Sequence, residues 1–105
     1  MARSQNPILD TLNSEIETIR NRFGVRSIGL FGSHVRGEAD RTSDIDVLVE
    51  FEEPTFDRYM DLKLFLEELF GVEVDVVLAD SVKPRLKPYI LDEVVYAEGS
   101  PGLSR

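Results

Sequence analysis

Apolar residues recur along this chain at two spacings, which predict helices in some segments and strands in others. From Pro7 to Phe23 they fall every three or four residues, the pattern of an amphipathic helix. Asn6 is a suitable cap for this helix, and Gly24 marks its end. The same spacing predicts a second long helix from Thr55 to Phe70.

Shorter apolar runs predict three strands, at residues 25–31, 44–51 and 72–78. The first is followed by a short turn or helix through Glu38 and a polar loop from Ala39 to Ser43. A last amphipathic segment, from about Pro88 to Tyr96, predicts another helix. This order indicates an α/β (α+β) fold, in which a small mixed β-sheet is flanked by helices.

Length and composition narrow the class of protein. A chain of 105 residues fits one domain, residues 1–105, in which we expect residues 1–6 and 99–105 to be flexible. The absence of cysteine excludes disulfides, thiolate catalysis and zinc–thiolate sites. The first residues are too polar for a secretory signal, and no apolar run approaches the roughly 18 residues of a membrane helix. We therefore expect a cytoplasmic protein that does not bind a membrane.

The net charge of −8, from 20 acidic and 12 basic residues, bears on the partners of the chain. A net negative charge repels the phosphate backbone of DNA and RNA, so we expect no direct binding to nucleic acid. It is compatible with a carboxylate site that holds cations or with a basic protein partner.

Two aspartates, Asp44 and Asp46, stand at the start of the second predicted strand. Because alternate residues of a strand share a face, both carboxylates project the same way, with Cα atoms about 6 to 7 Å apart. Carboxylates this close repel each other unless a cation lies between them, and magnesium is the natural candidate. Such pairs also occur by chance, but the apolar neighbours here predict a buried strand, where an unpartnered carboxylate is costly.

The Gly32-Ser33 pair follows an apolar strand and opens a short helix, as an anion-binding turn does. Glycine lets a phosphate approach the backbone, and the Ser33 hydroxyl adds a donor to a phosphate oxygen. Taken alone, the pair is better explained as a simple turn with a helix cap. Arg36 can either bind a triphosphate or pair with Glu38. Ser43 either orients the aspartate loop or caps its turn.

Asp75 is the only acidic residue within the apolar run from Val74 to Leu78. In a central strand this carboxylate would need a cation as partner. Pairing of its strand with residues 44–51 would bring three carboxylates to one face, which suits two-metal phosphoryl transfer with Asp75 as general base. The alternative is that Asp75 lies at a sheet edge and points into water.

Together these residues form a recognisable block. The motif resembles the signature of the DNA polymerase β-type nucleotidyltransferase superfamily: it consists of Gly32-Ser33, then ten residues, then Asp44-x-Asp46. Arg36-Gly37-Glu38 and Ser43-Asp44-Ile45-Asp46 make the block similar to the minimal nucleotidyltransferases in particular. The likeness extends from Ile28 to about Tyr96 and includes the stretch Lys83-Pro84-Arg85-Leu86.

This resemblance implies a polymerase β-like catalytic core that uses ATP and magnesium, with two ions expected. Members of the family are commonly encoded beside a HEPN-domain ribonuclease toxin, and several act as antitoxins by transferring AMP to a tyrosine of that toxin. The resemblance assigns metal binding and catalysis to Asp44, Asp46 and Asp75. It assigns the nucleotide to Gly32, Ser33 and Arg36, and we add Ser43 as a further nucleotide-binding candidate.

Other interpretations stay open from the sequence. The alternatives are that the chain neutralises its partner by binding alone, that it modifies a small molecule such as an aminoglycoside, or that it carries these aspartates by coincidence. The short length disfavours a small-molecule pocket. Tyr59, Phe65 and Tyr89 suit either the core or a partner surface, and we expect His34 to be exposed.

Overall fold

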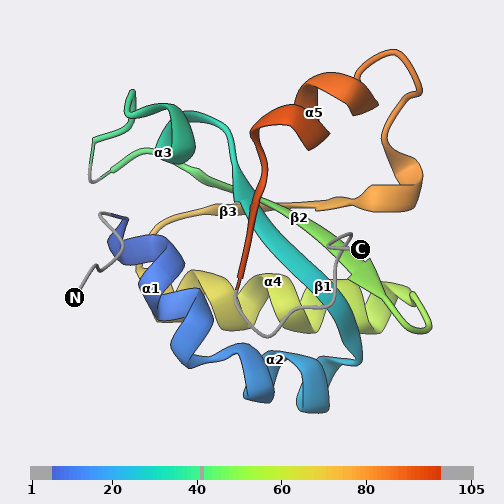
Figure 1. Ribbon diagram of the computed structural model, residues 1–105. Coiled ribbons are helices and arrows are strands. Elements are labelled where there is room, and N and C mark those ends of the chain that lie inside the picture. The colour runs from blue at the N-terminus through green and yellow to red at the C-terminus, as the bar shows by residue number, and fades with distance from the viewer. Residues whose placement is uncertain (1–5, 41, 98–105) are drawn as a thin grey trace.

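The secondary structure follows the predicted order, with one more strand at the end. The computed structural model describes residues 6–40 and 42–97. Within them the chain runs through α1 (Pro7–Ser14), α2 (Ile16–Phe23), β1 (Val25–Phe31), α3 (Ser33–Arg36), β2 (Ile45–Phe51), α4 (Phe56–Phe70), β3 (Val74–Leu78), the 3-10 turn η1 (Ala79–Ser81), α5 (Lys87–Glu93) and β4 (Val95–Tyr96) (Figure 1).

The strands form one mixed sheet in the order β3-β2-β1-β4. β1 is antiparallel to both β2 and β4, whereas β2 and β3 are parallel. The predicted small mixed sheet is confirmed, and β3 lies at its edge rather than at its centre.

The two faces of the sheet are used differently. α1, α2 and α4 cover one face, and α3 and α5 lie on the other side (Figure 1). The covered face holds the hydrophobic core. β1 and β2 contribute residues that are paired across the two strands, such as Ile28 with Val49 and Leu30 with Val47, and all four are fully buried. Tyr59 and Phe65 pack against this core, whereas Tyr89 is 74% exposed.

The prediction of one helix from Pro7 to Phe23 is wrong, because the segment is two helices joined at Glu15. The Ser14 hydroxyl donates to the Thr11 carbonyl at 2.9 Å, and Glu15 leaves helical geometry with φ −102° and ψ 7°. Side-chain bonds of this kind compete with the backbone ladder and bend helices. Leu12 of α1 and Ile19 of α2 are both fully buried in the core.

The prediction of a helix up to Tyr96 is also wrong at its end. α5 stops at Glu93, and Val95 and Tyr96 pair with Leu30 and Gly29 of β1. The free edge of β1 offers unpaired backbone groups, and pairing satisfies them.

The ends of the chain are described only in part. Asn6 caps α1, because its side chain accepts from the amides of Ile8 and Leu9 at 3.0 and 3.2 Å. The rest of the tails predicted to be flexible, residues 1–5 and 99–105, lies outside the described residues. In residues 6–40 and 42–97, no helix is both long and apolar enough to cross a membrane.

Two side chains of α4 hold the start of the edge strand β3. Lys63 Nζ donates to the Val74 carbonyl at 2.8 Å and to Glu67 Oε2 at 2.7 Å, while the Val74 amide donates to the same Glu67 oxygen at 3.1 Å. The hydrogen bond from Lys63 and the one from the Val74 amide lower the pKa of Glu67. The contact matters for the site because Val74 directly precedes Asp75.

We expect Glu67→Gln to lower Tm by about 2 to 4 °C near neutral pH, because a neutral amide binds Lys63 more weakly. A carboxylate with a lowered pKa stabilises the fold above its unfolded pKa, and that stability is lost as pH falls through the folded pKa. The melting curves of variant and wild type should therefore converge in acid. Glu68→Gln is the matched control, since Glu68 is exposed. A constant difference at every pH would contradict this account.

Candidate active site

The open face of the sheet carries a row of three side chains. Asp46 of β2 is in register with Phe31 of β1 on one side and with Asp75 of β3 on the other. A groove of about 610 Å³ lies over this row, between the sheet, α3 and the segment that includes α5. The residues that line this groove include Gly32, Arg36, Asp46, Asp75, Lys83, Arg85, Tyr89 and Glu93.

The three predicted carboxylates differ in their surroundings. Asp46 is half-buried, Asp75 is exposed on the edge strand, and Asp44 is exposed just before β2 begins. The prediction that Asp75 lies in a central strand is wrong, and its alternative of a sheet edge is confirmed. The conditional prediction that its strand pairs with the Asp46 strand is confirmed by the register.

Burial and like charge act together on Asp46. Partial burial raises the pKa of Asp46, and the negative charges of Asp75 and Asp44 raise it further. A raised pKa means that the ionised form is held at a cost, which a bound cation would remove. These surroundings therefore fit a cation at Asp46.

The carboxylates do not form a closed metal cage. No group of three or more His, Cys, Asp or Glu side chains in the described part of the chain is arranged to hold an ion by itself. Magnesium commonly takes one or two carboxylates and completes its shell with water and substrate phosphates. The donor set of Asp46 with its acidic neighbours fits that mode of binding.

The turn between β1 and α3 requires glycine. Gly32 has φ 86° and ψ −153°, a backbone conformation that is essentially confined to glycine. A Cβ atom built on Gly32 would overlap the Asp46 carboxylate. The turn therefore lies directly against that carboxylate, with room only for a residue that has no side chain.

Arg36 is held by two carboxylates. Its Nε donates to Glu38 Oε1 at 3.0 Å, and its Nη1 lies 3.2 Å from both oxygens of Glu93. The ion pair with Glu38, which was one interpretation of Arg36, is present. Arg36 also lines the groove beside Gly32, so the two roles are compatible.

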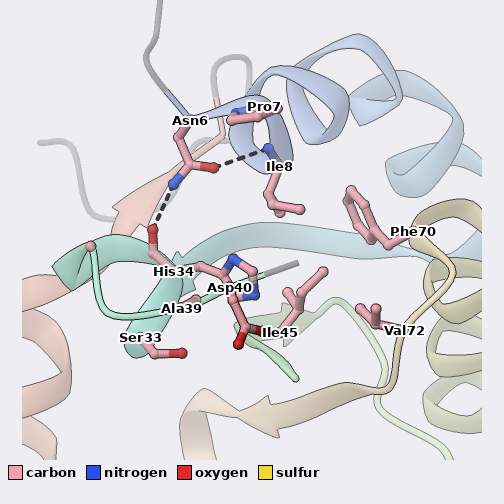
Figure 2. Close-up of a pocket in the computed structure, with 11 residues that line it drawn as sticks. Asn6, Pro7, Ile8, Ser33, His34, Ala39, Asp40, Ile45, Phe70 and Val72 are labelled. Atoms are coloured by element: carbon pink, nitrogen blue, oxygen red, sulfur yellow. Dashed lines mark hydrogen bonds between the residues drawn. The ribbon is translucent and has the colours of Figure 1, made fainter. Parts of the chain in front are cut away.

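Ser33, Ser43 and His34 lie away from this groove. Ser33 and His34 line a second pocket of about 540 Å³ between α1, α3 and the end of α4 (Figure 2). The Ser43 hydroxyl accepts from the Asp40 amide at 3.1 Å and so orders the loop before the aspartates. The expectation that His34 is exposed is wrong: it is half-buried, and its Nε2 lies 3.2 Å from the Ser43 carbonyl.

The second pocket is lined on one side by Asn6 and the first residues of α1. The Asn6 amide group donates to the His34 carbonyl at 2.8 Å, as Figure 2 shows, which fastens the first turn of α1 to α3. Asn6 therefore caps one helix and positions another.

Glu93, which accepts a hydrogen bond from the Gly32 turn, was not among the site residues predicted from the sequence. The amide of Gly32 donates to Glu93 Oε2 at 2.7 Å, across 61 residues of chain. One signal was available: Tyr89 and Glu93 stand four apart in an amphipathic helix, so both project on one face. Lys83 and Arg85 were noted only as part of the family resemblance, and both line the groove.

Comparison with known sequences identifies the family of the chain. A family model described as a nucleotidyltransferase domain matches residues 12–97. The protein adenylyltransferase MntA of Thermococcus cleftensis is 48% identical over 86 residues, which are 81% of this chain and 87% of that protein. A Methanocaldococcus jannaschii protein, named as a candidate protein adenylyltransferase, is 35% identical over 98 residues, 90% of this chain and 98% of the relative.

Solved structures agree with this assignment. A structure named as that of a candidate minimal nucleotidyltransferase is 42% identical, with a TM-score of 0.69, and the match covers 83% of this chain and 93% of that one. A toxin–antitoxin structure with AMP-PNP shares the fold, at 23% identity and a TM-score of 0.67 over 81% of this chain and 71% of the other. The chain belongs to the nucleotidyltransferase domain family, as a minimal nucleotidyltransferase.

Proposed function

We propose that this chain is a magnesium-dependent protein adenylyltransferase, which moves AMP from ATP to a tyrosine hydroxyl of a HEPN ribonuclease toxin and so acts as its antitoxin. The observation that carries the proposal is the row of Asp46 and Asp75 beside the Gly32 turn and Arg36, all around one groove. The 48% identity to a protein named protein adenylyltransferase supports a protein acceptor.

The proposed roles follow from position in the groove. Arg36 and the Gly32 amide bind the triphosphate, because a guanidinium and a backbone N–H are suitable donors to phosphate oxygens. Asp44 and Asp46 would hold magnesium, with Asp75 as a third ligand. When bound, the cation supplies electrostatic stabilisation of the charge that develops on the triphosphate during transfer. Ser33, which directly follows Gly32, and Ser43, which directly precedes Asp44, are proposed as further nucleotide-binding residues.

In the proposed reaction, the acceptor oxygen forms a bond to the α-phosphorus of ATP. The bond from that phosphorus to the bridging oxygen breaks, and pyrophosphate leaves. The proton of the hydroxyl passes to Asp75, which is exposed at the sheet edge and so within reach of an incoming side chain. A large protein acceptor suits an open edge better than a closed pocket does.

The partners that we propose are the toxin and the nucleotide, in the cytoplasm, without direct binding to nucleic acid or membrane. The charge of −8 supports this choice, since it opposes binding to polyanions.

The test is to incubate this protein with ATP, magnesium and a HEPN ribonuclease toxin, and to measure the intact mass of both proteins. We expect AMP to be added to the HEPN protein, and we expect a toxin whose acceptor tyrosine is replaced by phenylalanine to gain nothing. A tight complex without any added mass would refute transfer and favour neutralisation by binding. Transfer to an aminoglycoside in place of the protein would instead favour the small-molecule alternative.

A further inference from the structure

The groove already contains an anion of the chain itself, the carboxylate of Glu93. Glu93 Oε2 accepts from the Gly32 amide at 2.7 Å, and both of its oxygens lie 3.2 Å from Arg36 Nη1. The Glu93 side chain is 26% exposed to solvent, whereas the side chain of Glu38, the other partner of Arg36, is 62% exposed. Glu93 is thus the more enclosed of the two carboxylates at this arginine.

The donors that Glu93 occupies are those expected to bind a phosphate. A carboxylate and a phosphate both offer oxygens that accept charge-assisted bonds from a guanidinium and from a backbone amide. The contact to the Gly32 amide is at the short end of the range for N–H···O bonds. Arg36 keeps Glu38 as a second partner, so neutralising Arg36 does not by itself require Glu93.

The carboxylate and a triphosphate compete for the same groups. One N–H has one hydrogen, which makes one well-aligned bond, and two anions at one arginine repel each other. We propose that Glu93 is an internal competitor, which fills the phosphate position of the nucleotide-free enzyme and must be displaced when ATP binds. This inference rests on the proposed function, because it takes the triphosphate to bind at Gly32 and Arg36.

The surroundings of Glu93 allow its displacement. It is the last residue of α5, a helix in which no residue is buried, and the chain is anchored just beyond it where β4 pairs with β1. Lys83 and Arg85 line the same groove, and neither makes an ion pair within residues 6–40 and 42–97. They are available to receive the displaced carboxylate.

The test compares the binding of tripolyphosphate, and of ATP with magnesium, to wild type and Glu93→Gln by titration calorimetry. We expect Glu93→Gln to bind both ligands about tenfold more tightly, because a neutral amide competes less well for Arg36. Asp92→Asn is the matched control, since it removes one negative charge from the exposed side of the same helix. We expect its affinity to stay within about twofold of wild type.

Unchanged or weaker binding by Glu93→Gln would overturn the proposal and make Glu93 a positioning residue for Arg36. Glu93→Asp provides a second variant, because it keeps the charge but shortens the side chain by one methylene group, and we expect tighter binding there too. Intact-mass analysis of AMP transfer by the same wild-type preparation reports separately on the proposed function. AMP transfer by wild type, together with unchanged affinity in the Glu93 variants, would reject the proposed role of Glu93 and leave the proposed function standing.

Discussion

Replacing Asp44 and Asp46 together by asparagine is expected to lower AMP transfer at least about a thousandfold and to leave the fold intact. Neutral amides are poor ligands for magnesium, and the cation supplies several kcal/mol of stabilisation to the transferring phosphoryl group. Asparagine nearly matches aspartate in shape, so packing is preserved. The measurement is intact mass of the toxin over time, together with Tm and circular dichroism of the variant.

The thermal stability of this double variant separates a catalytic role from a structural one. Burial and the neighbouring carboxylates raise the pKa of Asp46, so its charge opposes folding at neutral pH in the absence of a cation. Removing the charges should leave Tm unchanged or raise it. Asp57→Asn with Asp61→Asn removes the same two charges from the exposed surface of α4 and should keep full activity. A double variant at Asp44 and Asp46 that unfolds would show that these aspartates are structural.

The second large effect is expected from Gly32→Ala. The added methyl group would overlap the Asp46 carboxylate, and the positive φ of Gly32 is unfavourable for alanine. We expect transfer to fall at least about a hundredfold, because a displacement near 1 Å at a reacting centre is enough for such a loss. Stability should fall by about 1 to 3 kcal/mol from backbone strain.

Gly71→Ala is the control for the strain component of this effect. Gly71 ends α4 with φ 75°, and a Cβ atom there would meet nothing within 4 Å. This variant should lose stability of the same order while its transfer activity stays near that of wild type. A folded Gly32→Ala protein with normal activity would rule out close packing of the turn against Asp46 as a requirement for catalysis.

Local chemistry explains why much of the fold was predictable. Asn6 caps α1 and Gly24 ends α2 in a left-handed conformation, as predicted from these residues alone. Thr55 and Gly71 do the same for α4. The strand predictions rest on runs of β-branched and apolar residues, which are equally local. Their observed limits differ from the predicted ones by no more than two residues.

The two errors of secondary structure have different causes. The break at Glu15 accompanies a local bond from the Ser14 hydroxyl to the Thr11 carbonyl, and nothing in the spacing of the apolar residues between Pro7 and Phe23 signals it. β4 is only two residues long and exists because the edge of β1 is free at Gly29 and Leu30. Neither a side-chain bond to the backbone nor a free sheet edge is encoded by the periodicity of apolar residues within one segment.

The sequence by itself determined the chemistry of this protein: the Gly32 turn, Arg36, the Asp44–Asp46 pair and the family to which they belong. Only the tertiary structure decided which groups meet. It set Asp75 beside Asp46 through parallel pairing, turned Ser33 and His34 toward a second pocket, and brought Glu93 to the Gly32 amide from 61 residues away. The physical reason is that residue type and spacing govern local conformation, whereas strand register and helix packing result from burial of the whole core.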